Sequence, residues 1–443
     1  MTNKSRFAPS PTGFLHIGNV RSALINWAHI NNKNGEFFLR IDDTDLERSK
    51  VEFINAIEED LKWLGIKWQK SFRQSERIFL YNSKVDILKK SKRLYPCFET
   101  QEELALKRKN QLSLGNPPIY DRSSVSLTKE KIKSLIDSGK KPHWRLKLED
   151  KIIEWNDLIK GKVSFDSRNL SDPILIREDG SFLYHLPSVA DDIEEGITDI
   201  IRGEDHISNT AFHIQIFEAL NADVPNFGHH PFLTDDKGKG LGKRLGSLSI
   251  RNLKEEGFEN ITIINYLLKI GTSQNLTKIK DLKNIRDSFD INTLAASSPK
   301  FSIDSLKLLN KDILKSYNFS EVKNKFLDLD IKDVTEDFWN FVKNNINFFS
   351  ETKFWWHIVN SDEIYEIKDK EYLHIAANLL PLDPFTTKSW EEWTENINKK
   401  TGKKGKELFL PLRIALTGLE KGPELKYLMP LLDRKKIVRK LGL

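Results

Sequence analysis

The sequence predicts an α/β protein built on a parallel sheet, with an inserted α+β segment and an all-helical C-terminal region. Three observations support this prediction. Strand-like and helix-like segments alternate over residues 1–98, which is typical of a parallel sheet. A more charged stretch, residues 99–180, then interrupts the alternation. Beyond residue 250 the apolar residues recur mainly at helical spacing, up to the C-terminus.

The first element is a short strand that enters a helix through a turn rich in proline and glycine, RFAPSPTGFLHIGN (residues 6–19). The prolines and the glycine exclude a helix before about His16. Apolar residues at helical spacing begin near Gly18, so a helix N-terminus is expected there. Unpaired backbone N–H groups and the helix dipole favour an anion such as phosphate at that point. An ordinary loop that contains a histidine is the alternative.

A second buried strand is predicted in GEFFLRIDDTD (residues 35–45), and it has an acidic end. A strand–helix–strand unit crosses over right-handed, so the carboxyl ends of both strands meet at one crevice, where ligands bind in open sheets. Residues 6–10 and 42–45 are therefore expected to face one pocket. Amphipathic helices at residues 51–66 and 75–92 are expected to follow, and then the strand LYPCF.

Residues 99–180 are expected to hold a capped basic helix, a second helix that ends at Gly139, and the strands PHWRLKL and KVSFDS. The parallel pattern resumes at residue 181, where a buried strand ends in the charged sequence RGEDH (residues 202–206) and a helix follows. A loop rich in glycine and lysine (residues 238–246) has the composition of a lid.

Composition excludes several classes of protein. The chain has 443 residues, of which 39% are hydrophobic and 10% aromatic, enough for buried cores and too many for general disorder. Its one cysteine, Cys97, excludes an internal disulfide and favours a cytoplasmic location. No stretch approaches the roughly 18 apolar residues that span a bilayer, so no membrane is expected. Residues 399–443 carry 13 Lys or Arg against 4 Asp or Glu, which favours a polyanionic partner, with a solubilising surface as the alternative.

Together, the helix start, the charged strand ends and the basic loop predict nucleotide chemistry. The chain has neither a GxxxxGK[ST] loop nor a GxGxxG fingerprint, so phosphate must be held in another way. At this point the motifs resemble those of the bacterial glutamyl-tRNA synthetases, which are class I aminoacyl-tRNA synthetases. PSPTGFLHIGN resembles their first signature, and RIDDTD, YHLPSVADD, RGEDHISNT and GLGKRLGS follow in the family's order and spacing.

The resemblance covers nearly the whole chain. It implies a Rossmann-like class I catalytic domain with an inserted α+β acceptor-binding domain, followed by an all-α C-terminal anticodon-binding region. The boundaries expected are 1–98 with 181–235 for the catalytic domain, 99–180 for the insertion, 236–305 for a stem-contact region with the KMSKS-like loop, and 306–443 for the anticodon-binding region.

The resemblance also implies the reaction of a glutamate–tRNA ligase. The carboxylate of L-glutamate attacks the α-phosphate of ATP, pyrophosphate leaves, and the glutamyl group passes to the 3′-terminal adenosine of tRNA(Glu). Whether tRNA(Gln) is a second acceptor is left open. ATP is expected to act with Mg²⁺, and the protein is expected to be a cytoplasmic monomer.

Site residues are carried over from the motifs one by one. The catalytic residues implied are His16, Lys243 and Arg244. The ATP-binding residues implied are His16, Gly18, Asn19, Asp205 and Lys243. The glutamate-binding residues implied are Arg6, Ala8, Ser10, Asp42, Tyr184 and Arg202. Guanidinium groups suit the two carboxylates of glutamate, although ion pairs with the acidic strand ends are the alternative for Arg6 and Arg202.

The chain departs from the family pattern at several points. GLGKR (residues 240–244) lacks the first lysine and the serine of the usual KLSKR-like element. Asp42 stands where glutamate is common, and Ser188 replaces a frequent asparagine. Some relatives carry a Cys-x-Cys and Cys-x-His zinc site in the insertion, where this chain offers only Cys97. One thiolate cannot make a tetrahedral site, so no structural zinc and no metal-ligating residues are expected.

Four alternatives stay open. A truncated paralogue that glutamylates a modified tRNA base would lack the helical C-terminal region, and a glutaminyl-tRNA synthetase would have β-barrels there. A small-molecule ligase or nucleotidyltransferase could share the nucleotide signature. A catalytically weakened tRNA-binding homologue is favoured only by the depleted GLGKR element.

Overall fold

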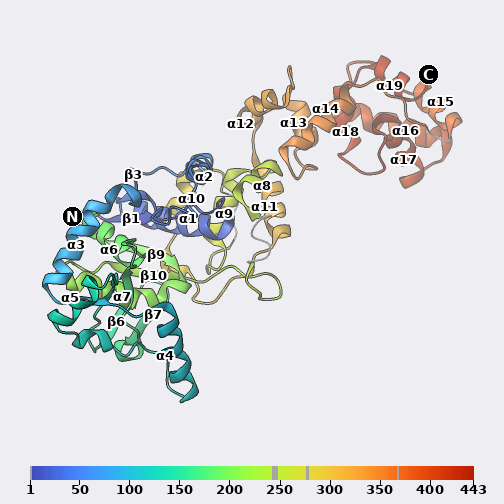
Figure 1. Cartoon of the computed structure of the whole chain (residues 1–443). Coiled ribbons are helices and arrows are strands. Elements are labelled where there is room, and N and C mark those ends of the chain that lie inside the picture. The colour runs from blue at the N-terminus through green and yellow to red at the C-terminus, as the bar shows by residue number, and fades with distance from the viewer. Residues whose placement is uncertain (1, 242–247, 276–278, 367–368) are drawn as a thin grey trace. The chain divides into compact units, whose positions relative to one another are not determined.

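The computed structural model describes residues 2–241, 248–275, 279–366 and 369–443. It divides into two compact units (Figure 1). The first comprises Met1–Leu253 and Ile263–Ser302, and the second comprises Lys254–Thr262 and Ile303–Leu443. Within the described ranges, no helix combines the length and the apolar character that crossing a membrane requires.

A five-stranded parallel sheet lies at the centre of the first unit. Its strand order is β10-β9-β1-β2-β3, and every neighbouring pair is parallel. The strands are β1 (Lys4–Phe7), β2 (Glu36–Ile41), β3 (Lys70–Arg73), β9 (Asp199–Gly203) and β10 (Asn226–His230). The sequence predicts β1, β2 and β9. It does not predict β3, which is half exposed, or β10, which buries two histidines instead of an apolar run.

The helices that join these strands are amphipathic or largely apolar. They are α1 (Ile17–Asn32), α2 (Val51–Trp63), α3 (Ile78–Lys90), α6 (His185–Glu195) and α7 (Ile207–Ala219). Helix α1 begins where the sequence predicts and buries Val20, Ala23 and Leu24 completely. Because α1 packs on β1, β2 and β9, its N-terminus is held at one edge of the sheet.

The segment between β3 and the return to the sheet is α+β, as predicted. A three-stranded antiparallel sheet has the order β4-β5-β8, with β4 (Leu94–Cys97), β5 (His143–Leu146) and β8 (Ile174–Ile176). Helices α4 (Gln101–Ser113) and α5 (Lys129–Asp137) lie between its first two strands in the chain. An antiparallel hairpin, β6 (Ile152–Asp157) and β7 (Gly161–Asp166), follows. The sequence does not predict β6.

Helices follow the parallel sheet: α8 (Ile250–Glu255), α9 (Asn260–Lys269) and α10 (Leu282–Asp287). In the second unit the described residues beyond 302 contain helices and no strand. The α-helices there are α11 (Ile303–Ser316), α12 (Phe319–Val322), α13 (Glu336–Val342), α14 (Thr352–Asn360), α15 (Lys370–Asn378), α16 (Thr387–Thr401), α17 (Gly405–Thr417), α18 (Leu425–Leu428) and α19 (Arg434–Lys440).

The second unit has its own aromatic core. Trp339 and Trp393 are fully buried in it, and each indole N–H donates to a backbone carbonyl, that of Tyr317 at 2.9 Å and that of Ala376 at 2.7 Å. A buried indole needs such an acceptor, so these tryptophans fit as core residues. The predicted helical C-terminal region is confirmed.

Candidate active site

A cavity of about 640 Å³ opens at the carboxyl ends of the parallel strands. Every described residue that the resemblance implies for catalysis or substrate binding lines it, namely Arg6, Ala8, Ser10, His16, Gly18, Asn19, Asp42, Tyr184, Arg202 and Asp205. They come from the ends of β1, β2 and β9, the start of α1 and the start of α6. The two remaining predicted residues, Lys243 and Arg244, lie outside the described residues.

His16 is the N-cap residue of α1. Its Nδ1 accepts the backbone N–H of Gly18 at 3.0 Å and that of Asn19 at 3.3 Å, while the Asn19 side chain accepts the backbone N–H of His16 at 3.4 Å. Since Nδ1 is an acceptor, the proton of the neutral ring belongs on Nε2. Burial lowers the pKa of His16, so the ring is neutral near pH 7. His16 can therefore offer a ligand a neutral Nε2–H donor.

Position 18 favours glycine because the imidazole ring of His16 lies directly against its backbone. A Cβ atom at this position would lie 2.9 Å from Cε1 and 3.0 Å from Nδ1 of His16. The sequence predicts unpaired backbone N–H groups that favour an anion at this helix start. In this structure the N–H of Gly18 is bonded to His16, so the helix end presents the imidazole rather than that N–H.

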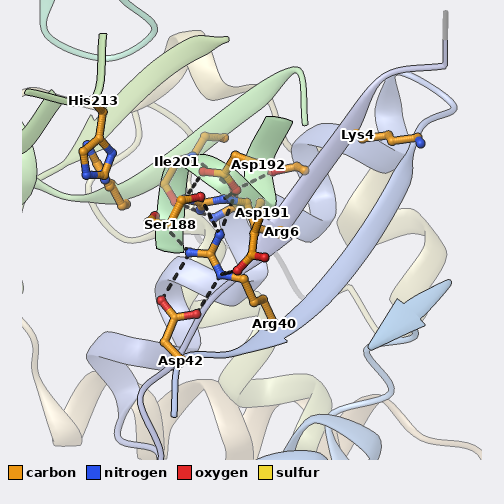
Figure 2. Close-up of polar contacts among 12 residues, drawn as sticks. Lys4, Arg6, Arg40, Asp42, Ser188, Asp191, Asp192, Ile201 and His213 are labelled. Carbon is orange, nitrogen blue, oxygen red and sulfur yellow. Dashed lines mark hydrogen bonds and ion pairs between the residues drawn. The ribbon is translucent and has the colours of Figure 1, made fainter. Parts of the chain in front are cut away.

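Two arginines on one side of the cavity are neutralised by buried carboxylates. Arg6 donates from Nε and Nη2 to Asp192, at 2.9 and 3.3 Å. Arg40 donates to both oxygens of Asp42, at 2.7 and 3.2 Å, and to Asp192 at 2.9 Å. Figure 2 shows both guanidinium groups converging on Asp192. Arg6 thus forms an ion pair, but its partner Asp192 lies on α6 and not at the acidic strand ends that the sequence suggests.

Ser188 also belongs to this network. Its backbone carbonyl and its hydroxyl each accept from Arg40 at 3.1 Å. The serine that replaces a frequent asparagine therefore contacts Arg40. Asp42, expected to meet the substrate ammonium, lines the cavity while both its oxygens already accept from Arg40. Sequence reasoning missed Arg40 and Asp192, although two consecutive acids within a helix that also carries apolar residues are a signal of buried ion pairs.

Arg202 has a different environment. It donates to the Tyr184 hydroxyl at 2.9 Å, to Thr210 Oγ1 at 2.7 Å and to His213 Nδ1 at 3.3 Å. No carboxylate of the described chain makes an ion pair with it within 4.0 Å. Burial lowers the pKa of Arg202 and the nearby charge of Arg6 adds to this effect, while Tyr184 and the more distant charge of Asp192 oppose it. The ion-pair alternative is therefore wrong for this arginine.

Arg21, on α1, is a second buried cation of this kind that the sequence reasoning missed. Its guanidinium donates to the carbonyls of Pro231 at 2.7 Å and Ile270 at 3.2 Å, and its Nε has no partner in the described part of the chain. Burial lowers its pKa to about 10. Arg21 lines the same cavity, where Asp205 presents a half-exposed carboxylate.

The cavity thus combines a neutral hydrogen-bond donor, two buried cations without close carboxylates, and an exposed carboxylate. Low-dielectric surroundings strengthen the attraction of such cations for an anion. The arrangement suits a ligand with separated negative charges, and it can stabilise negative charge that develops during a reaction.

One group of side chains outside the cavity resembles a metal site. Potential ligand atoms of Cys97, Glu99 and His143 lie within 4.8 Å of one another. Burial raises the pKa of the Cys97 thiol to about 11, and the Glu99 carboxylate already accepts from the Tyr120 hydroxyl at 2.7 Å and from two serine hydroxyls at 2.9 Å. A cysteine binds zinc as the thiolate, and a structural zinc site has four protein ligands, one more than this group offers. The expected absence of structural zinc stays a prediction.

Comparison with family models assigns both parts of the chain. The model for tRNA synthetases class I (E and Q), catalytic domain, matches residues 3–308. The model for an anticodon binding domain matches residues 333–442. Together with the parallel sheet and the helical second unit, these matches define a class I tRNA synthetase, and the predicted fold class is confirmed.

Curated relatives indicate which family of class I tRNA synthetases the chain resembles. Glutamate–tRNA ligase 1 of Rickettsia felis is 47% identical over 440 residues, covering 99% of this chain and 98% of the relative. Glutamate–tRNA ligase 2 of Hyphomonas neptunium is 44% identical over 439 residues, covering 99% of each. The chain belongs to the family of glutamate–tRNA ligases.

Solved structures agree at the level of the fold. The glutamate-tRNA synthetase of Elizabethkingia anophelis is 26% identical and superposes with a TM-score of 0.86, covering 100% of this chain and 99% of that one. A glutamate tRNA ligase of Elizabethkingia meningosepticum, solved in complex with its amino acid, is also 26% identical and has a TM-score of 0.88.

Proposed function

We propose that this chain activates L-glutamate with ATP and transfers the glutamyl group to the 3′-terminal adenosine of tRNA(Glu). The observation that carries the proposal is Arg202. It is a buried guanidinium at the wall of the cavity that donates to neutral side chains and lacks a close carboxylate. A substrate carboxylate would supply the missing counter-charge.

The chemistry of the reaction indicates which carboxylate of glutamate Arg202 binds. The α-carboxylate loses its charge when it becomes a mixed anhydride with the α-phosphate of ATP, whereas the side-chain carboxylate keeps its charge. A fixed buried cation is best matched by the group that remains charged throughout. We therefore assign Arg202, with the Tyr184 hydroxyl beside it, to the side-chain carboxylate.

The remaining glutamate-binding assignments follow the cavity lining. Ala8 and Ser10 line the wall, and Asp42 receives the substrate ammonium by adding a third interaction to its pair with Arg40. Arg6 contributes to the α-carboxylate side while Asp192 holds its guanidinium in place. In this assignment Arg6 mainly orients the α-carboxylate of glutamate, and Arg202 attracts the side-chain carboxylate by its charge.

ATP is assigned to the helix-start side of the same cavity. His16 donates its Nε2–H to a phosphate oxygen, and Gly18 and Asn19 hold the imidazole in that orientation. Catalysis of the displacement is alignment of the attacking carboxylate with neutralisation of the charge on the leaving pyrophosphate. Arg21 adds positive potential there, and Lys243 and Arg244 are proposed from their sequence motif to complete it.

Mg²⁺ is proposed to enter with ATP and to neutralise phosphate charge. The Asp205 carboxylate at the cavity wall is an oxygen ligand of the kind that Mg²⁺ prefers. Within this assignment Asp205 contacts the nucleotide either directly or through its cation.

For tRNA, we propose that residues 99–180 bind the acceptor end, residues 236–305 contact the stem and residues 306–443 bind the anticodon. The excess of basic residues in 399–443 supports a polyanion at that end. We propose tRNA(Glu) as the acceptor, with tRNA(Gln) as a further candidate, and a monomeric cytoplasmic enzyme.

Pyrophosphate exchange tests the proposal. Purified protein is incubated with ATP, labelled pyrophosphate and one amino acid, with and without unfractionated tRNA. Label is expected to enter ATP with glutamate. The absence of exchange with glutamate in both conditions would overturn the proposal, and exchange supported by glutamine alone would redirect it to glutamine. Retained tRNA binding without exchange would identify a catalytically weakened homologue.

A further inference from the structure

Arg202 donates its hydrogen bonds to side chains other than carboxylates. Its Nε donates to His229 Nε2 at 3.5 Å, and the other nitrogen of that ring is bonded to Asp157. The Nη1 of Arg202 donates to the Tyr184 hydroxyl and to His213 Nδ1, and its Nη2 donates to Thr210 Oγ1. Thr210 and His213 both come from α7, three residues apart, so one face of this helix presents them together. His213 is completely buried.

The direction of the hydrogen bonds fixes the state of His213. A guanidinium group has donors and no acceptor, so the Nδ1 that faces Arg202 must be unprotonated. The proton of the neutral ring is then on Nε2, which lies 3.2 Å from Nδ1 of His185 and donates to it. Burial and the charge of Arg202 hold the pKa of His213 well below its ordinary value. The ring therefore orients Arg202 as a neutral acceptor.

Arg6, which lines the cavity, and Arg40, which is buried beside it, are held differently. Arg6 is bonded to Asp192, and Arg40 is bonded to Asp42 and Asp192. His213 stands apart from these ion pairs (Figure 2). A carboxylate in the place of His213 would orient the guanidinium of Arg202 equally well and would cancel its charge. A neutral acceptor at this position leaves that charge for the ligand.

We propose that His213 is a positioning residue that fixes the guanidinium of Arg202 without neutralising it, and that this neutrality makes the cavity select a carboxylate over a carboxamide in the substrate side chain. The inference rests on the proposed function, because it concerns how glutamate is recognised.

Glutamate and glutamine are nearly equal in size, so steric fit does not separate them. A buried cation separates them, because a carboxylate forms a charge-assisted pair with it and a carboxamide leaves it without a counter-charge. If a protein carboxylate already occupies that role, glutamate adds a second negative group to one cation and loses its advantage. The charge at position 213 therefore determines the preference.

The test compares His213→Asn with His213→Asp. The side-chain oxygen of each can take the place of Nδ1, and the two variants differ in one atom and one charge. Pyrophosphate exchange gives kcat and KM for glutamate, for glutamine and for ATP in the full-length protein. His213→Leu is the third variant, since it removes the acceptor and leaves Arg202 charged.

The inference predicts different outcomes for the two polar variants. His213→Asn should raise KM for glutamate by less than about 10-fold and keep the preference for glutamate. His213→Asp should raise KM for glutamate by about 100-fold, lower the glutamate-to-glutamine ratio of kcat/KM by at least about 10-fold, and leave KM for ATP unchanged. His213→Leu should raise KM for glutamate by about 10-fold and retain the preference, and it still tests charge selection if the Asp variant does not fold.

Equal KM values for glutamate and equal glutamate-to-glutamine ratios of kcat/KM in the Asn and Asp variants would overturn the inference about His213. The proposed function would still be supported by exchange with glutamate in the wild type. Loss of the preference in His213→Leu would also overturn it, because Arg202 remains charged there. A wild-type protein with no glutamate-dependent exchange would overturn the proposed function, and that result is obtained before any variant is made.

Discussion

Arg202→Met is expected to weaken glutamate recognition strongly while changing the stability of the fold very little. The reason is that Arg202 has no carboxylate partner that the substitution would leave buried and unpaired. Arg40→Met is the matched control, since it makes the same replacement at a buried arginine whose removal leaves Asp42 and Asp192 without that cation.

The magnitudes follow from these contacts. Loss of Arg202 removes hydrogen bonds to Tyr184, Thr210 and His213, each worth about 1 kcal/mol net, and a long one to His229 at 3.5 Å. It also removes the cost of burying a charge that has no ion-pair partner. These effects oppose each other, so the free energy of unfolding should change by no more than about 1 kcal/mol. Arg40→Met leaves buried carboxylates without this cation, and it should lower the free energy of unfolding by about 3–5 kcal/mol. For catalysis, losing a buried ion pair with the substrate costs about 2–5 kcal/mol, or about 30- to 5,000-fold in kcat/KM for glutamate.

Urea unfolding and pyrophosphate exchange of both variants give these quantities directly. Thermal unfolding with added glutamate provides a third value, since a bound ligand stabilises the native state and Arg202→Met should lose that stabilisation. The reasoning is refuted if Arg202→Met is destabilised as strongly as Arg40→Met, or if its kcat/KM for glutamate stays within about 3-fold of wild type.

Further predictions concern the nucleotide side, the fold and metal content. His16→Asn keeps an oxygen that can cap α1 but lacks the Nε2–H, so kcat should fall by about 10²–10³ with an unchanged unfolding temperature, and a normal kcat would exclude the donor role. Burial alone would raise the pKa of Asp157, but hydrogen bonds from His229 and nearby backbone N–H groups outweigh it and lower this pKa from 3.8 to about 2. Its stabilisation of about 2–3 kcal/mol is therefore present above pH 4 and lost as the pH falls towards 2, and Asp157→Asn should flatten the urea-unfolding profile over pH 2–5, whereas parallel profiles would contradict the assignment. Lys243→Ala should cut the exchange rate at least about 100-fold with tRNA affinity in filter binding nearly intact, and an unaltered rate would show that another group does its work. Elemental analysis of the purified protein should find far less than one equivalent of zinc, and a full equivalent that resists dialysis would contradict the prediction.

The sequence could place the residues of the cavity because topology forces them together. Parallel strands joined by right-handed crossovers bring their carboxyl ends to one edge, so Arg6, Asp42 and Arg202 were predicted to meet there from periodicity and motif order. The helix start at His16 was equally predictable, since proline and glycine exclude a helix just before it. The strand of this sheet that periodicity misses most clearly is β10, whose buried residues include two histidines where apolar side chains are expected.

The charge state of each arginine could not be predicted in the same way. Arg6 and Asp192 are separated by 186 residues in the sequence, and only the packing of α6 against the sheet brings them to 2.9 Å. The sequence does not reveal the neutral acceptors of Arg202 either, because a histidine on an otherwise apolar helix such as α7 is usually an ordinary core residue. The one signal was that Thr210 and His213 share a face of that helix.

The central claim is that an unneutralised buried arginine selects glutamate. The most direct measurement is aminoacylation of tRNA by the wild-type chain with labelled glutamate, glutamine or aspartate under identical conditions. We expect glutamyl-tRNA, with kcat/KM for glutamate at least about 100-fold above that for glutamine. Charging of glutamine at a comparable rate would contradict it.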